Sequence, residues 1–408
     1  MAGVGSERAQ RADPSVDEVR LPERDEIPTE ELGPEVARSA EEADEAAESF
    51  FARPKRLIQT GVLVLLLIGG IYFLFPKVVG VEGTFQRFGD AEPIWLAVAL
   101  AMAFVMFLSY GALFRGVTAR GLDLSFPEAY QITMAGLAAA LLFSAGGAGG
   151  VVLTYWAITK AGLEARRAVC RMIAFLVLLY GVYVTTVLVD GILLRSGVLH
   201  GPHPVGLTIV PAAIAAAVIV IFLLISLIPS DLERRAARFD DSGRLGRLAR
   251  RLAPAPATLA RGTKTALYLV RNPGGGSGGG LAIAGAIGYW AANVGILWAS
   301  FHAYGVSVPL GVVVMGFFVG LAANLVPGAP AGVGAVDAGM IGVFVLFGYS
   351  GNAVFPAILT YRLFAFWLPI PPGIFAFFKL RRTVARWEAE RRRSSRLGRE
   401  IAGARAIL

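Results

Sequence analysis

The chain has 408 residues, of which 55% are hydrophobic and only 17% are charged, and its mean hydropathy is +0.62. These values exclude an ordinary soluble protein and indicate a polytopic membrane protein. One cysteine and three histidines exclude an intramolecular disulfide and a multi-cysteine metal site, and the net charge of +8 comes from basic segments beside apolar runs, which favours anionic lipid over nucleic acid as a partner.

Residues 1–52 form an acidic segment with fifteen Asp or Glu and five Arg. Such a composition cannot bury enough apolar surface to order itself, so we expect a disordered cytoplasmic tail. The first apolar run, 57–75, follows Arg53, Lys55 and Arg56. The run lacks the pattern of a short basic n-region, an apolar h-region and a cleavage site, so it is predicted to be a retained membrane helix rather than a signal peptide, with its preceding basic residues in the cytoplasm.

Five further apolar runs approach the ~20 residues that a helix needs to cross a bilayer. Two other segments each contain two apolar arms around a glycine-rich break, and broken backbone at membrane depth must be buried in protein or line a wet cavity. The five runs are 93–114, 168–190, 205–228, 281–304 and 353–378, and the broken segments are 127–162, interrupted at 144–150, and 306–348, interrupted at 324–337.

Basic residues predict that each broken segment is a re-entrant hairpin. Lys and Arg gather at 115–126 and 160–171, on both sides of the first broken segment, and also at 231–271 and 379–408. The positive-inside rule places all four regions in the cytoplasm. The first hairpin then opens to the cytoplasm, the second opens to the outside, and both termini are cytoplasmic.

The chain also contains an internal repeat. Residues 119–153 match 303–337 at ten of 35 positions without a gap, including GLAA at 136–139 and at 320–323. The two halves have opposite predicted topologies, an arrangement found in many transporters. The predicted fold is therefore an all-α polytopic integral membrane protein with six spanning helices plus two re-entrant helical hairpins arranged as an inverted repeat.

The domain boundaries follow from these segments. The basic loop inside repeat 2 either lies along the inner membrane surface or connects helices in solution. We expect the acidic tail at 1–52, the transmembrane domain at 53–380 and a basic cytoplasmic tail at 381–408, with repeat 1 at about 57–195, repeat 2 at about 205–378 and the basic loop at 229–280.

Two motifs resemble those of the lysylphosphatidylglycerol synthase transmembrane-region family, also called flippase-like domain proteins. NLVPGAPAGVGAVD (324–337) is similar to that family's N-x-x-P-x-x-P-G-G-x-G-x-x-E, and YRLFAFWLP (361–369) to its R-L-x-x-[FY]-W-x-P. Ala331 stands where the family has glycine, and Asp337 where it has glutamate. The resemblance covers roughly 57–380 and implies lipid translocation or lipid handling. With 30 residues after Phe378, we expect no aminoacyl-transferase domain.

Charged residues inside spans are the first candidates for a site, because an ionisable group in hydrocarbon costs from about 2.5 to over 10 kcal/mol. Arg362 either forms a structural ion pair with Asp337 or contacts substrate, and such a pair at a broken helix could bind and release phosphate by exchanging partners. Arg171 occupies the position of Arg362 in the first repeat, although it could equally snorkel to the cytoplasmic surface.

The remaining candidates each have a plainer alternative. The glycines of both breaks could offer backbone N–H groups to an anion or could simply pack helices closely. Lys160 could attract a headgroup phosphate or act only as a positive-inside residue, Glu128 is expected to cap a helix start near Ser125, and Asp190 is expected at the membrane interface. The predicted substrate-binding set is Arg362, Asp337, Asn324, Gly328, Gly332, Gly334, Arg171, Gly146, Gly147, Gly149, Gly150 and Lys160.

These features favour a flippase-like transporter of the inner (cytoplasmic) membrane that moves an anionic phospholipid or lipid-linked saccharide without nucleotide hydrolysis. An intramembrane lipid-modifying enzyme and a non-transporting scaffold or sensor stay open as alternatives. We expect no catalytic residues, no metal and no cofactor, because the chain shows no nucleophile–base pair and no phosphate-binding loop motif. The expected partners are membrane lipids with anionic headgroups, a second copy of the chain and a cytoplasmic partner of the acidic tail.

Overall fold

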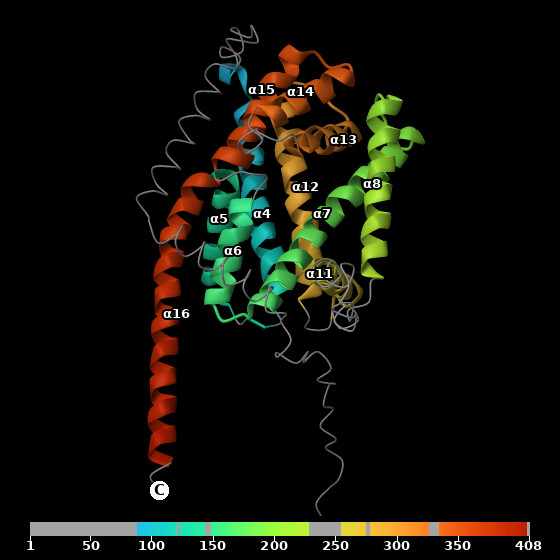
Figure 1. The fold of residues 1–408 in the computed structure, drawn as a ribbon. Helices are drawn as coiled ribbons and strands as arrows, with labels where there is room; N and C mark the ends of the chain where they lie inside the picture. Colours follow the sequence, from blue (N-terminus) through green and yellow to red (C-terminus); the bar gives the residue numbers. More distant parts are fainter. Residues whose placement is uncertain are drawn as a thin grey trace, which may run out of the picture. The chain divides into compact units, whose positions relative to one another are not determined.

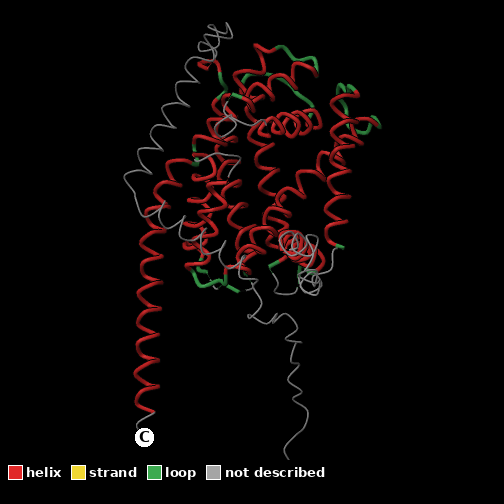
Figure 2. Tube along the Cα trace, viewed as in Figure 1, coloured by secondary structure: helices red, strands yellow, loops and turns green. Residues whose placement is uncertain are grey.

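The computed structural model describes residues 88–119, 121–122, 124–142, 148–227, 254–274, 278–325 and 334–405. All of them belong to one compact unit, Asp44–Leu408. Within these ranges the chain forms helices joined by loops and no strand (Figure 2). The predicted all-α class is therefore confirmed for the described part, whereas the acidic tail at 1–52 and the first predicted span at 57–75 lie outside it.

Five helical segments in the described part are long and apolar enough to cross a membrane. Each overlaps one of the five further runs predicted from the sequence, so the chain is a polytopic membrane protein. The segments are α4 (Pro93–Thr118), α7 (Ala165–Arg195), α8 (Val205–Ser226), α12 (Gly279–Ala303) and Gly351–Ser394, which consists of α15 (Gly351–Arg362), the π-helical turn η4 (Leu363–Trp367) and most of α16 (Ile370–Arg405).

Helices α4 and α12 pack along each other over a long stretch, and glycines let their backbones approach (Figure 1). A methyl group at Gly285 would lie 2.3 Å from the Leu113 amide nitrogen, and one at Gly116 would lie 2.4 Å from the Ala282 amide nitrogen. Small residues at such contacts maximise van der Waals packing where lipid provides no hydrophobic drive. The pair is therefore built from its glycines.

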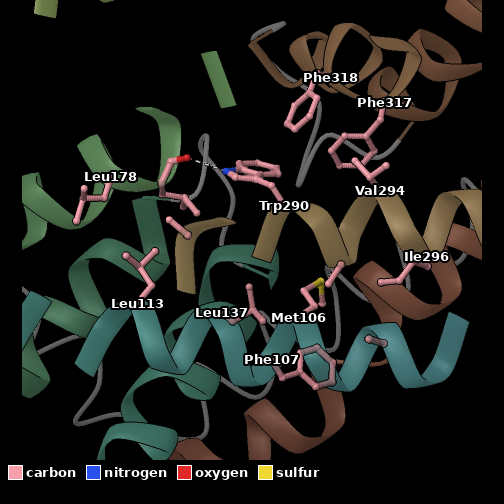
Figure 3. Close-up of a cluster of buried hydrophobic side chains, with 14 of the residues drawn as sticks. Met106, Phe107, Leu113, Leu137, Leu178, Trp290, Val294, Ile296, Phe317 and Phe318 are labelled. Carbon is pink, nitrogen blue, oxygen red and sulfur yellow. Dashed lines mark hydrogen bonds between the residues drawn. The ribbon is translucent and has the colours of Figure 1, made fainter. Parts of the chain in front are cut away.

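Aromatic side chains join α7, α12 and α13 (Leu310–Leu321) at the centre of the core. Trp290 lies against Phe317 and Phe318, and its indole N–H donates to the Leu179 carbonyl at 2.7 Å (Figure 3). The Tyr183 hydroxyl donates to the Phe318 carbonyl. These two hydrogen bonds satisfy the polar ends of large aromatic groups inside the apolar interior, as buried Trp and Tyr require.

The two broken segments each form an antiparallel pair of short helices. In the first hairpin, α5 (Phe126–Leu142) packs on α6 (Ala148–Lys160), and a methyl at Gly136 would lie 2.6 Å from the Thr154 hydroxyl oxygen. In the second hairpin, α13 packs on α14 (Ala335–Leu346), and a methyl at Gly320 would lie 2.7 Å from Met340 Cα. The residue numbers in contact rise along one arm as they fall along the other, which defines the antiparallel course.

Helix α16 lies along α5 of the first hairpin. The Trp387 indole donates to a Glu128 carboxylate oxygen at 3.1 Å, and the Ser125 amide donates to the other oxygen at 2.9 Å, so the predicted capping role of Glu128 is confirmed. Burial raises the pKa of Glu128, but these hydrogen bonds and the charge of Arg386 outweigh it and hold the pKa below its ordinary value. An ionised Glu128 therefore fastens α16 to the start of α5.

Part of the predicted basic loop and most of the predicted basic tail are helical. Helix α11 (Pro254–Arg271) packs against α7, where Gly262 meets Ile173, and α16 continues as one helix to Arg405. Two short 3-10 turns, η1 (Phe88–Asp90) and η2 (Ala322–Leu325), complete the described elements.

Candidate functional site

The break in the second hairpin separates η2 from the start of α14. Asn324 lies in η2 and is exposed. Gly334 is the N-cap of α14 and has a φ of +80°, a left-handed conformation that glycine adopts at little cost. Gly328 and Gly332, which the sequence also proposed for the site, lie outside the described residues. The described wall of the break is therefore the N-terminal turn of α14.

Asp337 lies in that first turn and is 4% exposed. One carboxylate oxygen, Oδ2, accepts a hydrogen bond from the Gly334 amide at 2.9 Å. This is half of a capping box, because glycine has no side chain to return a bond to the helix. A carboxylate in the first turn also interacts favourably with the helix dipole. The local sequence thus explains both the start of α14 and the orientation of Asp337.

Arg362 is the last residue of α15 and is 6% exposed. Its Nε donates to Asp337 Oδ1 at 2.6 Å, and its guanidinium carbon lies 5.2 Å from the centre of the Phe366 ring. Immediately after Arg362 the helix widens into the π-helical turn η4, which ends with a bond from the Leu368 amide to the Leu363 carbonyl. Single π-helical turns inside helices are frequent at functional sites.

A buried polar contact holds α15 beside this ion pair. The Tyr361 hydroxyl donates to Asn293 Oδ1 at 3.2 Å, and Asn293 is 4% exposed on α12. The Tyr361 ring also meets Phe317 edge-on. Sequence reasoning assigned neither Tyr361 nor Asn293 to the site. The available signal was an amide side chain inside a predicted span, because polar groups at that depth need a partner.

The chemical meaning of the pair follows from its burial. A carboxylate and a guanidinium together carry no net charge, so the interior tolerates them only as partners. The guanidinium has five N–H donors in a planar fork, a geometry that suits carboxylate and phosphate alike. The Arg362 guanidinium is therefore a group whose geometry suits an anionic ligand as well as Asp337.

The glycines of the first hairpin are only partly described. Gly150 lies so close to α5 that a methyl group there would be 2.5 Å from the Gly136 carbonyl oxygen. Close packing alone therefore requires glycine at this position, an alternative that the sequence left open. Gly149 lies beside it in the first turn of α6, and Gly146 and Gly147 fall outside the described residues.

The structure does not bring Lys160 or Arg171 to the Asp337–Arg362 pair. The Lys160 ammonium nitrogen lies 3.6 Å from a Glu388 carboxylate oxygen on α16, at the opposite end of α6 from Gly150 and about 15 Å along the helix. Arg171 lies in the part of α7 that packs on α11. In the predicted repeat Arg171 is the counterpart of Arg362, but the two arginines do not share a site.

Asp190, which is expected near the membrane interface, is buried inside the protein. It is 6% exposed within α7, and its Oδ2 is buried without a hydrogen-bond partner in the described part of the chain. The helices that cover it come from other parts of the chain, so hydropathy along α7 alone could not identify this burial.

A known family matches the part of the chain that contains these elements. The family model of the lysylphosphatidylglycerol synthase transmembrane region matches residues 58–373. That range includes both hairpins and the Asp337–Arg362 pair. No curated protein sequence matches the chain.

Proposed function

Because the chain belongs to the lysylphosphatidylglycerol synthase transmembrane-region family, we propose that it moves an anionic phospholipid or a lipid-linked saccharide across the cytoplasmic membrane without nucleotide hydrolysis. The family and the apolar helices support a role in handling membrane lipid. The observation that carries the transport proposal is the buried Asp337–Arg362 ion pair beside a break in the second hairpin. A paired charge is the kind of group that an anionic headgroup could engage inside an apolar protein.

In the proposed mechanism, the headgroup phosphate takes the place of Asp337 on the Arg362 guanidinium. A phosphate can accept two parallel N–H bonds from the planar fork, which makes it a competitive partner for arginine. Asp337 keeps its bond from the Gly334 amide during the exchange. Return of Asp337 to Arg362 then releases the lipid unchanged.

We further propose that the chain has six spans and two re-entrant hairpins in an inverted repeat, with both termini cytoplasmic. The two GLAA motifs support the repeat, because Gly136 and Gly320 occupy equivalent positions and each lies against the second arm of its own hairpin. Shared packing at an equivalent residue is what two homologous hairpins would retain.

Cysteine accessibility tests this topology on a background without Cys170. Single cysteines at positions 120 and 160 should react with a membrane-impermeant reagent from the cytoplasmic side, and cysteines at 328–334 from the outside. Labelling of positions 120 and 160 from opposite sides would contradict the first hairpin and the inverted repeat together.

Transport is tested with purified protein in vesicles that contain a fluorescent anionic phospholipid. We expect protein-dependent movement of the label between leaflets without added nucleotide, and mass spectrometry should recover the lipid unaltered. The double variant Asp337→Asn/Arg362→Gln should insert normally but lose the movement. The matched control is Arg382→Gln, which removes an exposed arginine from α16.

Normal movement by the double variant would remove the ion pair from the mechanism. A chemically altered lipid would favour the enzyme alternative, and the absence of movement by the wild-type protein with a panel of anionic lipids would favour the scaffold alternative.

A further inference from the structure

Asp190 is an acidic residue buried within the apolar helix α7. Asp190 is 6% exposed in α7, and its Oδ2 makes no hydrogen bond within the described part of the chain. The adjacent Gly191 faces two other helices: a methyl group there would lie 2.8 Å from the Thr208 carbonyl oxygen of α8 and 3.2 Å from Met315 of α13. Asp190 is thus next in the chain to a residue that lies where α8 and α13 meet α7.

Asp190 also falls within the contact between α7 and the second hairpin. That contact begins where Tyr183 donates to the Phe318 carbonyl and ends where Leu194 meets Gly311. Positions 183 and 194 of α7 enclose position 190 on the same helix. The first arm of the second hairpin therefore packs along the stretch of α7 that carries the carboxyl group.

The two helices that meet at Gly191 carry no ionisable side chain. Neither Val205–Ser226 (α8) nor Leu310–Leu321 (α13) contains Asp, Glu, His, Lys, Arg, Tyr or Cys. On its own helix the nearest charge is Arg195, which is exposed at the C-terminal end, and His200 and His203 in the following loop are exposed as well.

The other helices that pack on α7 contact it farther from Asp190. Helix α11 meets α7 at Ile173, about 26 Å along the helix from Asp190, and Trp290 of α12 meets α7 at Leu179 and Tyr183, the nearer of which is about 11 Å away. Helix α4 meets α7 through the rings of Tyr110 and Phe175. The ionisable groups of these helices are Arg261, Lys264, Tyr268 and Arg271 on α11, Tyr289 and His302 on α12, Tyr110 and Arg115 on α4, and Tyr155 and Lys160 on α6, which ends before α7 begins.

An ionised carboxylate with a buried, unbonded Oδ2 in this part of the chain is strongly unfavourable, because neither α8 nor α13 supplies a positive side chain. The neutral acid avoids that cost and can donate its hydroxyl proton to a backbone carbonyl. Pro211 within α8 leaves the Leu207 carbonyl without its usual intrahelical amide donor, next to Thr208, which Gly191 contacts. This part of the chain thus contains both a carboxyl group that favours a proton and a carbonyl able to accept a hydrogen bond.

We propose that Asp190 is a proton-binding site: with a proton bound, it stabilises the packing of α7 on α13, and loss of that proton to water loosens the second hairpin from α7. The step balances as one carboxyl O–H bond broken and one proton transferred to solvent. Its consequence for lipid movement rests on the proposed function, because the same hairpin carries the Asp337–Arg362 pair. The proton site itself does not depend on it.

Infrared spectra of wild type and variants, each reconstituted at neutral pH, are compared to test directly for the bound proton. Wild type should show the carbonyl stretch of a protonated carboxylic acid, Asp190→Asn should lose it, and Asp190→Glu should show it at a shifted frequency. Asp90→Asn, the same change at an exposed carboxyl in η1, is the matched control and should leave the band unchanged. A band that survives in Asp190→Asn, or no band in wild type, would overturn the proposal.

The second measurement follows the hairpin without any lipid transport. With Cys170 replaced by alanine, a cysteine at position 315 of α13 is labelled by a thiol reagent over a range of pH, with and without Asp190→Asn. At each pH, the labelling rate with Asp190 present is divided by the rate with Asp190→Asn, which cancels the ionisation of the thiol itself. We expect this ratio to rise several-fold as the pH is raised. A ratio independent of pH would refute the coupling.

These outcomes are separate from the transport assay. Vesicles that fail to move lipid would count against the proposed function, whereas the infrared band and the labelling ratio would still decide whether Asp190 binds a proton and controls the hairpin.

Discussion

Breaking the Asp337–Arg362 pair should destabilise the protein more than removing it. The Nε–Oδ1 distance is 2.6 Å, and the two residues are 4% and 6% exposed, so neither charge can turn to water when its partner is removed. Loss of one member of a buried pair typically costs about 3–5 kcal/mol, and we expect this for Asp337→Asn and for Arg362→Gln alike.

The double variant strands no charge. It loses the ion pair and the contact of the guanidinium with the Phe366 ring, a contact worth about 1–2 kcal/mol when desolvated. The side-chain oxygen introduced by Asp337→Asn would still accept a hydrogen bond from the Gly334 amide. The double variant should therefore be more stable than either single variant by about 2 kcal/mol.

Equilibrium unfolding in mixed micelles of SDS and a mild detergent measures these differences. Arg382→Gln and Asp90→Asn are the matched controls, because each removes a charge of the same sign from an exposed position. Single variants that stay within about 1 kcal/mol of wild type, or a double variant whose loss equals the sum of the single losses, would refute the reasoning.

Three further predictions use the same chain. Arg362→Lys should keep its stability but lose most lipid movement in vesicles, since lysine keeps the charge without the planar fork; full transport would reduce the pair to a structural role. Gly136→Ala and Gly320→Ala should each lower the free energy of unfolding by about 1–3 kcal/mol in SDS titrations. Gly342→Ala should not, because the space around Gly342 is open. Equal effects of the three substitutions would contradict the close packing of the hairpins. Because the folded-state pKa of Glu128 is depressed, the stability that its ionised carboxylate contributes is present above its ordinary pKa and is lost as the pH falls through the lower folded value. Thermal unfolding measured against pH should show this loss of stability in wild type and not in Glu128→Gln. Identical profiles would exclude the role of Glu128.

Sequence reasoning succeeded where the lipid environment dictates the answer. A span must be apolar over about 20 residues whatever it packs against, so the five described membrane segments could be located from hydropathy alone. Breaks in helices were equally visible, because Gly and Pro act through the backbone. Asp337 and Arg362 were visible as ionisable residues within apolar segments, and the suggestion that they pair agrees with the observed contact.

Contacts between distant segments required the tertiary structure. Lys160 meets Glu388 only because α16 continues as a helix along the first hairpin, and Gly150 is explained by the carbonyl of Gly136 on the facing arm. Periodicity reports which residues are apolar but not which helix covers them.

Asp190 shows this limit most clearly. Its place at the end of the predicted apolar run 168–190 indicated an interfacial carboxylate, and local sequence contains nothing against that interpretation. The amino-acid sequence by itself determined the apolar helices, their breaks and the residues able to form an ion pair, since each depends on solvent or on the local backbone. Tertiary packing alone decided that Asp190 is buried, because the burial of a side chain depends on helices that the chain brings from elsewhere.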